Sequence, residues 1–322
     1  MTPEPSSPSA ERQGREPVST RAERHGRELG ASIRVWMMAA RPRTLPAAVA
    51  PVLVGTALAA HDADVNWLAF AAALVGAVAI QVGTNLSNDY SDARRGADTE
   101  DRLGPMRVTA GGLVPPRQVL VATWVSFGVA VLAGAYLTAV AGWELLAVGA
   151  ASILAGVLYT GGPRPYGYEG LGELFVFLFF GVVAVTGSYF VQVENLAWEA
   201  FVLAVPVGLL AAAILVVNNV RDLETDRRAG KRTLVVRLGR PRARILFAGM
   251  LASAFLIAPV PWLLGSLSPW LLLVGLAVPL AVPLVRTVNN RTDGPSLNVA
   301  LARTGLLQLV FCALLSAGIL LS

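Results

Sequence analysis

Long apolar runs separated by short polar segments dominate the chain from about residue 44 onwards. Nine of these runs are close to the roughly 20 residues that an α-helix needs to cross a bilayer. The pattern therefore predicts an all-α membrane protein with nine transmembrane helices. The predicted spans are 44–61, 65–88, 119–141, 143–161, 170–192, 198–219, 243–264, 267–286 and 297–321.

The N-terminal segment has a different composition. Residues 1–34 are rich in Pro, Ser, Glu and Arg and contain few large apolar side chains. Such a segment buries too little apolar surface to offset its ordering entropy, so we expect a disordered, Arg-rich cytosolic tail. Residues 33–40 have the pattern of a short amphipathic helix lying at the membrane surface. We expect residues 35–322 to form a single transmembrane domain.

Composition supports the membrane assignment. The 322 residues are 55% hydrophobic and 15% charged, whereas soluble domains carry about a quarter charged residues. The single cysteine, Cys312, excludes a disulfide framework and a cysteine metal site. A net charge of +5 is explained by the charge asymmetry of membrane proteins, so no nucleic-acid partner is expected.

The distribution of basic residues fixes an expected topology. If the nine spans alternate in direction, every Lys and Arg except Arg303 falls on one side of the membrane or at its edge. The loops on the other side carry only acids, at positions 62, 64, 144 and 194. Because positive loops stay in the cytoplasm, we expect a cytoplasmic N-terminus and an external C-terminus.

Two polar clusters lie where apolar runs end on the predicted cytoplasmic side. The second, Asn218, Asp222 and Asp226, has spacings of four, which places the three side chains on one helical face. The first comprises Asn85, Asn88, Asp89, Asp92 and Asp98. Carboxylates that lie close together repel each other unless a cation lies between them. Surface salt bridges are the alternative, but two such clusters on one membrane face favour a shared metal site.

The ligand types indicate magnesium. Carboxylate and amide oxygens, without nearby His or Cys, suit a hard cation, and Mg²⁺ in proteins is often shared with substrate phosphates. Basic residues follow both clusters, among them Arg95, Arg107, Arg221 and Lys231. Arginine binds phosphate through two parallel hydrogen bonds, and lysine acts as a point charge. A diphosphate at the mouth of an apolar bundle implies a lipid tail running into it.

A turn-rich segment joins the fourth and fifth runs. Residues 159–172 read YTGGPRPYGYEGLG, and their glycines and prolines allow a tight turn near the mouth. Tyr159 lies deepest in its run and is the candidate for contacting substrate. Tyr166 and Tyr168 fit either the site or an interfacial aromatic belt.

These motifs resemble the UbiA superfamily of intramembrane prenyltransferases, nine-helix bundles with two Asp-rich motifs. The second motif is intact as Asn218-xxx-Asp222-xxx-Asp226. In the first, Asn88-xxx-Asp92 is followed by Gly96 at the next fourth position, and the carboxylate appears at Asp98. This shift, with DRLGPMR and YTGGPRPYGYEGLGE, is most similar to the branch that prenylates 1,4-dihydroxy-2-naphthoate. The resemblance covers the chain from about residue 35.

The resemblance implies an activity and roles for the site residues. Substrates would be polyprenyl diphosphate and 1,4-dihydroxy-2-naphthoate, and the product, after decarboxylation, demethylmenaquinol of menaquinone biosynthesis. It implies a bacterial plasma-membrane enzyme whose cytoplasmic loops cap the site. The expected Mg²⁺ ligands are Asn88, Asp92, Asp98, Asn218, Asp222 and Asp226. Asn85 and Asp89 would either hydrogen-bond to these ligands or take the place of one of them. Arg95, Arg107, Arg221 and Lys231 would bind the diphosphate, and Tyr159 the aromatic acceptor.

Two alternatives compete with this interpretation. A cation-coupled transporter would also place carboxylates in a membrane domain, but near the bilayer midplane rather than among arginines at helix ends. Related prenyltransferases use other acceptors, such as 4-hydroxybenzoate, homogentisate, chlorophyllide or haem. The Gly96 and Asp98 register argues against these acceptors by resemblance.

Overall fold

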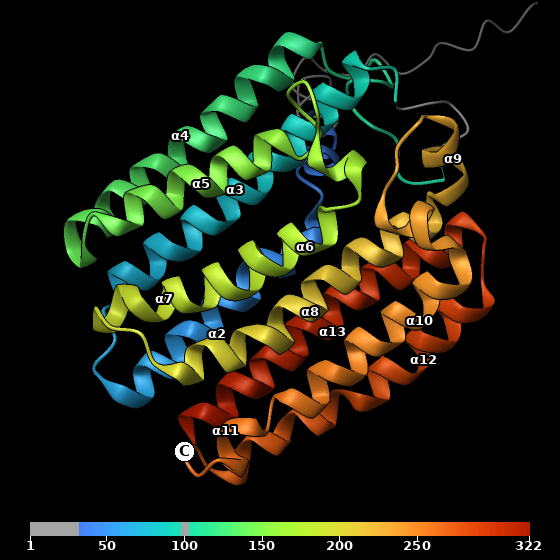
Figure 1. Cartoon of the computed structure of the whole chain (residues 1–322). Coiled ribbons are helices and arrows are strands. Elements are labelled where there is room, and N and C mark those ends of the chain that lie inside the picture. The colour runs from blue at the N-terminus through green and yellow to red at the C-terminus, as the bar shows by residue number, and fades with distance from the viewer. Residues whose placement is uncertain (1–31, 98–102) are drawn as a thin grey trace, which may run out of the picture.

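The computed structural model describes residues 32–97 and 103–322, and within these ranges every regular element is helical (Figure 1). A helix at 32–40 precedes the labelled elements. These are η1 (Pro42–Thr44), α2 (Pro46–Asp62), α3 (Trp67–Arg94), α4 (Pro116–Ala141), α5 (Glu144–Leu158), η2 (Tyr166–Glu169), α6 (Gly172–Phe177), η3 (Leu178–Val183), α7 (Ala184–Val193), α8 (Trp198–Arg221), α9 (Leu223–Arg228), α10 (Leu234–Ile257), α11 (Val260–Leu263), η4 (Pro269–Ala277), α12 (Val278–Asn290) and α13 (Gly294–Leu320).

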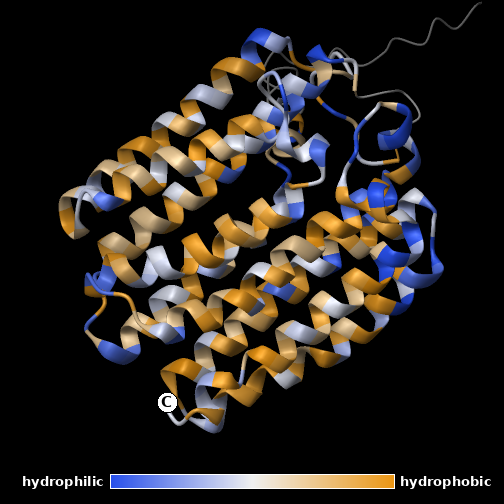
Figure 2. Cartoon of the chain, viewed as in Figure 1, coloured by the Kyte–Doolittle hydropathy of each residue, from blue (hydrophilic) through white to orange (hydrophobic). Residues whose placement is uncertain are grey.

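The predicted membrane-spanning character is confirmed. In the described residues, 7 helical segments are long and apolar enough to cross a bilayer, and 8 if the bent pair Ser32–Thr44 and Pro46–Asp62 counts as one span. Glu144–Leu158 is also apolar but has only 15 residues. Figure 2 shows hydrophobic residues along the helix bodies and hydrophilic ones concentrated at the helix ends and loops. The chain is therefore an integral membrane protein.

The first predicted span differs in detail. The predicted lead-in is helical, but it meets α2 at an angle of 51°. Arg41 ends the helix at 32–40 with a left-handed φ of 55° and ψ of 67°, and the bend lies between η1 and α2, which begin at Pro42 and Pro46. Proline disfavours the α conformation in the residue before it, so the helix at 32–40 does not continue through Arg41 into Pro42. The predicted disorder of the tail falls on residues 1–31, which are not described.

Helix α8 lies at the centre of the bundle. Its most apolar window is 72% buried, the highest fraction among the spanning segments of the described residues. It packs against the α6–η3–α7 segment on one side and against α10 and α13 on the other. Glycines bring α8 and this segment together, because a Cβ at Gly181 would lie 2.6 Å from Cα of Gly208. The polar end of α8 is thus fixed from several sides.

Three loops gather at one end of the bundle, close to the C-terminal ends of α3 and α8 (Figure 1). They connect α3 to α4, α5 to α6, and α9 to α10. Helix α3 continues to Arg94, beyond its predicted end at residue 88, so Asn88 and Asp92 still lie on the helix. A 2.8 Å backbone hydrogen bond from Arg232 N to Tyr168 O joins the α9–α10 loop to the α5–α6 loop.

Candidate functional site

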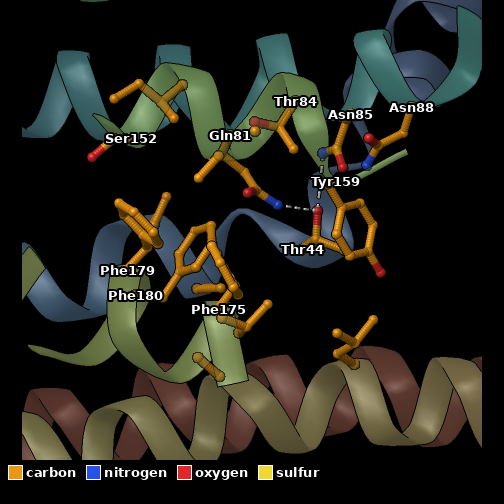
Figure 3. Close-up of a pocket in the computed structure, with 18 of the residues that line it drawn as sticks. Thr44, Gln81, Thr84, Asn85, Asn88, Ser152, Tyr159, Phe175, Phe179 and Phe180 are labelled. Carbon is orange, nitrogen blue, oxygen red and sulfur yellow. Dashed lines mark hydrogen bonds between the residues drawn. The ribbon is translucent and has the colours of Figure 1, made fainter. Parts of the chain in front are cut away.

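A cavity enters the bundle at the end where the loops gather. Its mouth is polar and its interior apolar, with walls from α2, α3, α5, α8 and the α6–α7 segment. Figure 3 shows Gln81, Asn85 and Asn88 on one wall, opposite Phe175 and Phe179. The predicted site residues along it are Asn85, Asn88, Asp92, Arg107, Tyr159, Asn218, Asp222, Asp226 and Lys231.

The first predicted cluster divides into different environments along α3. Asn85 Nδ2 donates to Ala40 O at 3.0 Å and to Thr44 Oγ1 at 3.2 Å, which holds the helix break against α3. Asn88 Oδ1 accepts a 2.9 Å hydrogen bond from Thr160 Oγ1. Both Asp89 oxygens accept backbone N–H groups, from Val108 at 3.1 Å and Thr109 at 2.9 Å. Asp89 therefore anchors the α3–α4 loop.

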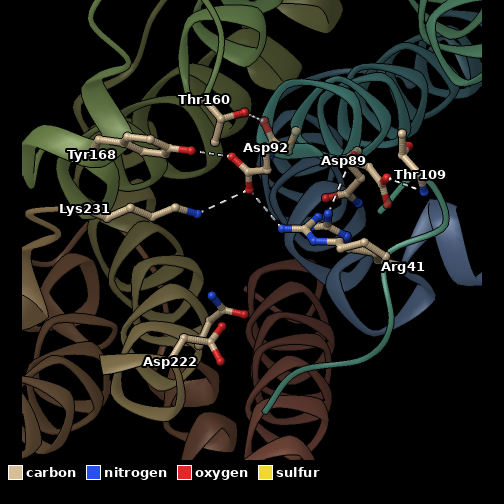
Figure 4. Close-up of polar contacts among 12 residues, drawn as sticks. Arg41, Asp89, Asp92, Thr109, Thr160, Tyr168, Asp222 and Lys231 are labelled. Carbon is tan, nitrogen blue, oxygen red and sulfur yellow. Dashed lines mark hydrogen bonds and ion pairs between the residues drawn. The ribbon is translucent and has the colours of Figure 1, made fainter. Parts of the chain in front are cut away.

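Asp92 is the point where the three loops meet, and it is 1% exposed. Its Oδ1 accepts a 2.7 Å hydrogen bond from the Tyr168 hydroxyl. Its Oδ2 lies 3.4 Å from Nη2 of Arg107. The same oxygen lies 3.4 Å from Nζ of Lys231 (Figure 4). The Lys231 ammonium also lies 4.8 Å from the centre of the Tyr168 ring. One carboxylate thus brings together a basic residue from each of two loops and a tyrosine from the third.

The second predicted cluster lies across the cavity, at the end of α8. Arg221 donates to both oxygens of Asp222, at 2.7 and 2.6 Å, and to Oδ1 of Asn218 at 2.8 Å. It also donates to Asn298 of α13 at 2.7 Å. Asp222 lies between α8 and α9, and Asp226 follows on α9. Figure 4 shows Asp222 on the opposite side of the site from Asp92.

Tyr159 lies where α5 ends and the turn-rich loop begins. Its ring packs edge-on against Tyr166, with centroids 5.5 Å apart, and Tyr166 stacks on Phe175 at 4.0 Å. The Tyr166 hydroxyl donates to Ala155 O at 2.9 Å, and burial raises the pKa of this phenol. The phenol therefore stays protonated. Gly167 lies so close that a Cβ there would be 2.7 Å from Tyr159 O. These contacts fix Tyr159 on the cavity wall.

Four predicted residues do not line the described cavity. Asp89 and Arg221 are buried in the contacts given above. Arg95 donates to Gly162 O and lies 5.9 Å from the Tyr168 ring centre. Asp98 lies outside the described residues. Within those residues, no three His, Cys, Asp or Glu side chains converge as a metal-binding group. Asp92 and Asp222 instead contact basic side chains.

Several polar residues of the site were not predicted from the sequence. Arg41 and Asn219 line the cavity, and Glu173 is buried behind it. Pro42 predicts a helix break directly after Arg41, and this break could have identified Arg41 as a candidate from the sequence. Glu173 and Asn219 carry no such signal, because only the packing of α6 on α8 brings them together at 2.9 Å.

Comparisons with known proteins agree with this architecture. A model of the UbiA prenyltransferase family matches residues 48–320. The chain is 44% identical to a 1,4-dihydroxy-2-naphthoate octaprenyltransferase of Mycobacterium tuberculosis, covering 90% of this chain and 98% of the relative. It is 39% identical to an Escherichia coli protein of the same name, with coverage of 90% and 96%.

Solved structures share the fold. A UbiA homolog from Archaeoglobus fulgidus, bound to DMAPP and Mg²⁺, superposes with a TM-score of 0.64 at 16% identity, covering 88% of this chain and 98% of the other. An apo UbiA homolog from Aeropyrum pernix K1 gives a TM-score of 0.65 at 15% identity, with coverage of 86% and 97%. The predicted UbiA-type helical bundle is therefore confirmed.

Proposed function

Because the chain belongs to the UbiA prenyltransferase family, we propose that it transfers a polyprenyl group from polyprenyl diphosphate to 1,4-dihydroxy-2-naphthoate. Loss of CO₂ gives demethylmenaquinol, a step of menaquinone biosynthesis. The proposal rests on the cavity, which has acidic and basic side chains at its mouth and an apolar interior. It occurs in a chain 44% identical, over nearly its whole length, to a naphthoate octaprenyltransferase.

Magnesium is the proposed metal. The acidic and amide donors at the mouth offer oxygen only, which suits this hard cation. We assign as ligands Asn88 and Asp92 on one wall and Asn218, Asp222 and Asp226 on the other, all of which line the cavity. Asp98 stays a predicted ligand, and Asn85 and Asp89 support the first wall through the hydrogen bonds given above. When bound, Mg²⁺ would neutralise charge on the diphosphate.

Lys231 and Arg107 are the proposed diphosphate-binding residues. Both line the cavity and lie within 3.4 Å of the Asp92 carboxylate, so their charges are held at the mouth. Positive charge placed in advance where the leaving group gains negative charge lowers the barrier to its departure. Diphosphate contacts by Arg95 and Arg221 stay predictions. The observed hydrogen bonds of Arg221 favour a role in orienting Asn218 and Asp222.

The apolar interior protects the reactive intermediate. The carbon–oxygen bond to the diphosphate breaks, and both electrons leave with the diphosphate. The resulting allylic cation is shielded from water by walls that include Phe175, Phe179 and Val183. The naphthoate ring carbon bearing the carboxylate then forms the new carbon–carbon bond. CO₂ departs and leaves its bonding electrons in the ring, which restores aromaticity.

Tyr159 is the proposed contact for the aromatic acceptor. It lies on the cavity wall between the polar mouth and the phenylalanine side chains of α6 and η3 (Figure 3). An aromatic ring in this place can stack on or pack edge-to-face against a naphthalene ring. Such packing would hold the acceptor beside the first carbons of the prenyl chain.

The proposed topology has nine crossings, obtained by counting the bent pair as one span and α5 as a short one. The N-terminus then lies in the cytoplasm, as do the three loops at the cavity mouth, and the membrane is the bacterial plasma membrane. The basic residues near the mouth support this orientation. Soluble substrate would then enter from the cytoplasmic side.

The test is an acceptor panel with purified protein in nanodiscs. Radiolabelled polyprenyl diphosphate is supplied with 1,4-dihydroxy-2-naphthoate or 4-hydroxybenzoate, with Mg²⁺ or EDTA. We expect magnesium-dependent transfer to the naphthoate only. Transfer only to 4-hydroxybenzoate would overturn the acceptor but not the reaction class, whereas no transfer to any acceptor would overturn the class and favour a transporter.

A further inference from the structure

A buried carboxylate lies behind the cavity wall. Glu173, in the first turn of α6, is 3% exposed, and its Oε1 accepts a 2.9 Å hydrogen bond from Nδ2 of Asn219. Its other oxygen is buried without a hydrogen-bond partner among the described residues. Burying an ionisable group within an apolar membrane bundle is costly, so such a residue is a candidate for a functional role.

Close helix packing places Glu173 against α8. A Cβ at Gly172 would lie 3.1 Å from Leu215 Cδ2, and one at Gly181 would lie 2.6 Å from Gly208 Cα. These glycines let α6 and η3 approach α8 more closely than larger residues would allow. The π-helical turn of η3 (Leu178–Val183) lies in the same contact, and π turns occur frequently at functional sites. Glu173 consequently reaches Asn219, which lines the cavity.

The hydrogen bond determines which way the Asn219 amide points. A carboxylate only accepts hydrogen bonds, so Asn219 turns its NH₂ group towards Glu173 and its oxygen away. That oxygen lies 3.4 Å from Nδ2 of Asn218. The Asn218 oxygen in turn accepts a 2.8 Å hydrogen bond from Arg221, which only donates. The acceptor at one end and the donor at the other fix both amides in one orientation.

We infer that Glu173 is a positioning residue for the site. Through Asn219 it holds the side-chain oxygen of Asn218, rather than its NH₂ group, towards Arg221, which also donates to Asp222. A divalent cation needs an oxygen at this position, because an amide NH₂ group does not coordinate it. Glu173 itself does not line the cavity and acts only through this chain of hydrogen bonds. The inference rests on the proposed metal–diphosphate site.

The test measures metal binding rather than turnover. Purified wild-type protein and variants are titrated with Mn²⁺ in the presence of inorganic pyrophosphate, and free Mn²⁺ is followed by EPR. We expect Glu173→Leu to weaken Mn²⁺ binding about tenfold, the equivalent of one lost hydrogen bond to a charged group. Glu173→Gln keeps an acceptor for Asn219, so we expect a change of at most about threefold.

A double-variant cycle tests whether the effect passes through Asn219. Asn219→Leu alone is expected to weaken Mn²⁺ binding about tenfold, and adding Glu173→Leu to it should cause no further loss. Losses that multiply in the double variant would overturn the inference, as would wild-type Mn²⁺ affinity in folded Glu173→Leu. If that variant does not fold, Glu173→Ala, which also removes the acceptor, gives the same comparison in the wild-type and Asn219→Leu backgrounds.

Gln308→Leu is the matched control. Gln308 is fully buried on α13, and its Nε2 donates to Val207 O of α8 at 3.4 Å. Its loss should lower thermal stability but leave Mn²⁺ affinity unchanged, and an equal loss of affinity would overturn the inference. Failure of wild-type prenyl transfer would count against the proposed function instead. If wild-type transfer is intact but Mn²⁺ affinity does not depend on Glu173, only this inference fails.

Discussion

At the scale of single residues, Asp92 connects most of the site. It accepts a hydrogen bond from Tyr168 and lies 3.4 Å from both Arg107 and Lys231. Because its two side-chain oxygens carry all these contacts, its charge determines where two cations of the mouth are held. The neighbouring Asp89 faces the α3–α4 loop, so adjacent acids on one helix have different roles.

Replacement of Asp92 should remove most activity. In Asp92→Asn the shape is kept but the charge is lost, so we expect kcat/KM to fall about 100-fold or more. Asp62→Asn is the control, because Asp62 also accepts a tyrosine hydrogen bond, from Tyr189 at 2.6 Å, but lies at the C-terminal end of α2 and does not line the cavity. The measurement is kcat/KM for prenyl transfer by both variants. Near-wild-type turnover of Asp92→Asn at saturating Mg²⁺ would contradict the metal assignment.

Tyr168 offers a finer test of the same site. Tyr168→Phe removes the hydroxyl that donates to Asp92 but keeps the ring beside Lys231. Losing a hydrogen bond to a charged group should lower kcat/KM about tenfold. Tyr90→Phe is the control, since the Tyr90 hydroxyl accepts a 3.0 Å hydrogen bond from Arg94, with the guanidinium 5.7 Å from the ring centre, and Tyr90 does not line the cavity. Equal effects of the two substitutions would show that the Asp92 contact has no special role.

At the scale of elements, spacing in the sequence predicted part of the site. Asn218, Asp222 and Asp226 were expected on one helical face, and all three line the cavity although α8 ends at Arg221. Hydrogen bonds from Asp222 N to Asn218 O and from Asp226 N to Asp222 O continue the helical pattern across the break. The four-residue spacing therefore places the three side chains along the cavity even though α8 ends before Asp222.

Contacts between helices could not be predicted in this way. The buried position of Arg221 depends on its hydrogen bond to Asn298 of α13. The Glu173–Asn219 hydrogen bond depends on glycines that let α6 and η3 pack closely on α8. Both need the relative placement of helices distant in sequence. A periodic pattern in one segment carries no information about that placement.

The turn between α5 and α6 leaves no room for a side chain at Gly167. In Gly167→Ala the new methyl group would lie 2.7 Å from atoms of Tyr159. Such overpacking costs about 1–3 kcal/mol, so we expect a lower Tm and a loss of activity as Tyr159 shifts. Gly249→Ala on α10 is the control, because a Cβ there meets nothing within 4 Å. Unchanged Tm and kcat/KM in Gly167→Ala would contradict the observed packing.

At the scale of the whole molecule, the apolar runs predicted most spans, because the bilayer requires long apolar helices wherever the chain crosses it. The predicted spans differ from the structure before α2, where Arg41 interrupts the helix and the chain bends between η1 and α2, and at α5, which is shorter than predicted. The bend follows from local prolines and could have been predicted. The shortness of α5 reflects the glycine-rich turn that brings Tyr159 into the cavity.

The proposed orientation predicts which ends of the molecule face outwards. Two single-cysteine variants are made in a Cys312→Ser background, Glu224→Cys on α9 and Ser322→Cys at the C-terminus, both at exposed positions. Spheroplasts that contain either variant are treated with a membrane-impermeant maleimide. We expect Ser322→Cys to react in intact spheroplasts and Glu224→Cys only after permeabilisation. The reverse pattern, or equal labelling of both before permeabilisation, would rule out nine crossings with an internal N-terminus.

Prenyl transfer and decarboxylation are proposed to occur together at this cavity. A double-label experiment tests this coupling, with 1,4-dihydroxy-2-naphthoate labelled with ¹⁴C in its carboxylate and a tritiated polyprenyl diphosphate in one magnesium-containing reaction. We predict one ¹⁴CO₂ released for each tritiated chain transferred, with both products lost in EDTA and in Asp92→Asn. Prenyl transfer that retains the labelled carboxylate, or CO₂ release without transfer, would contradict the account.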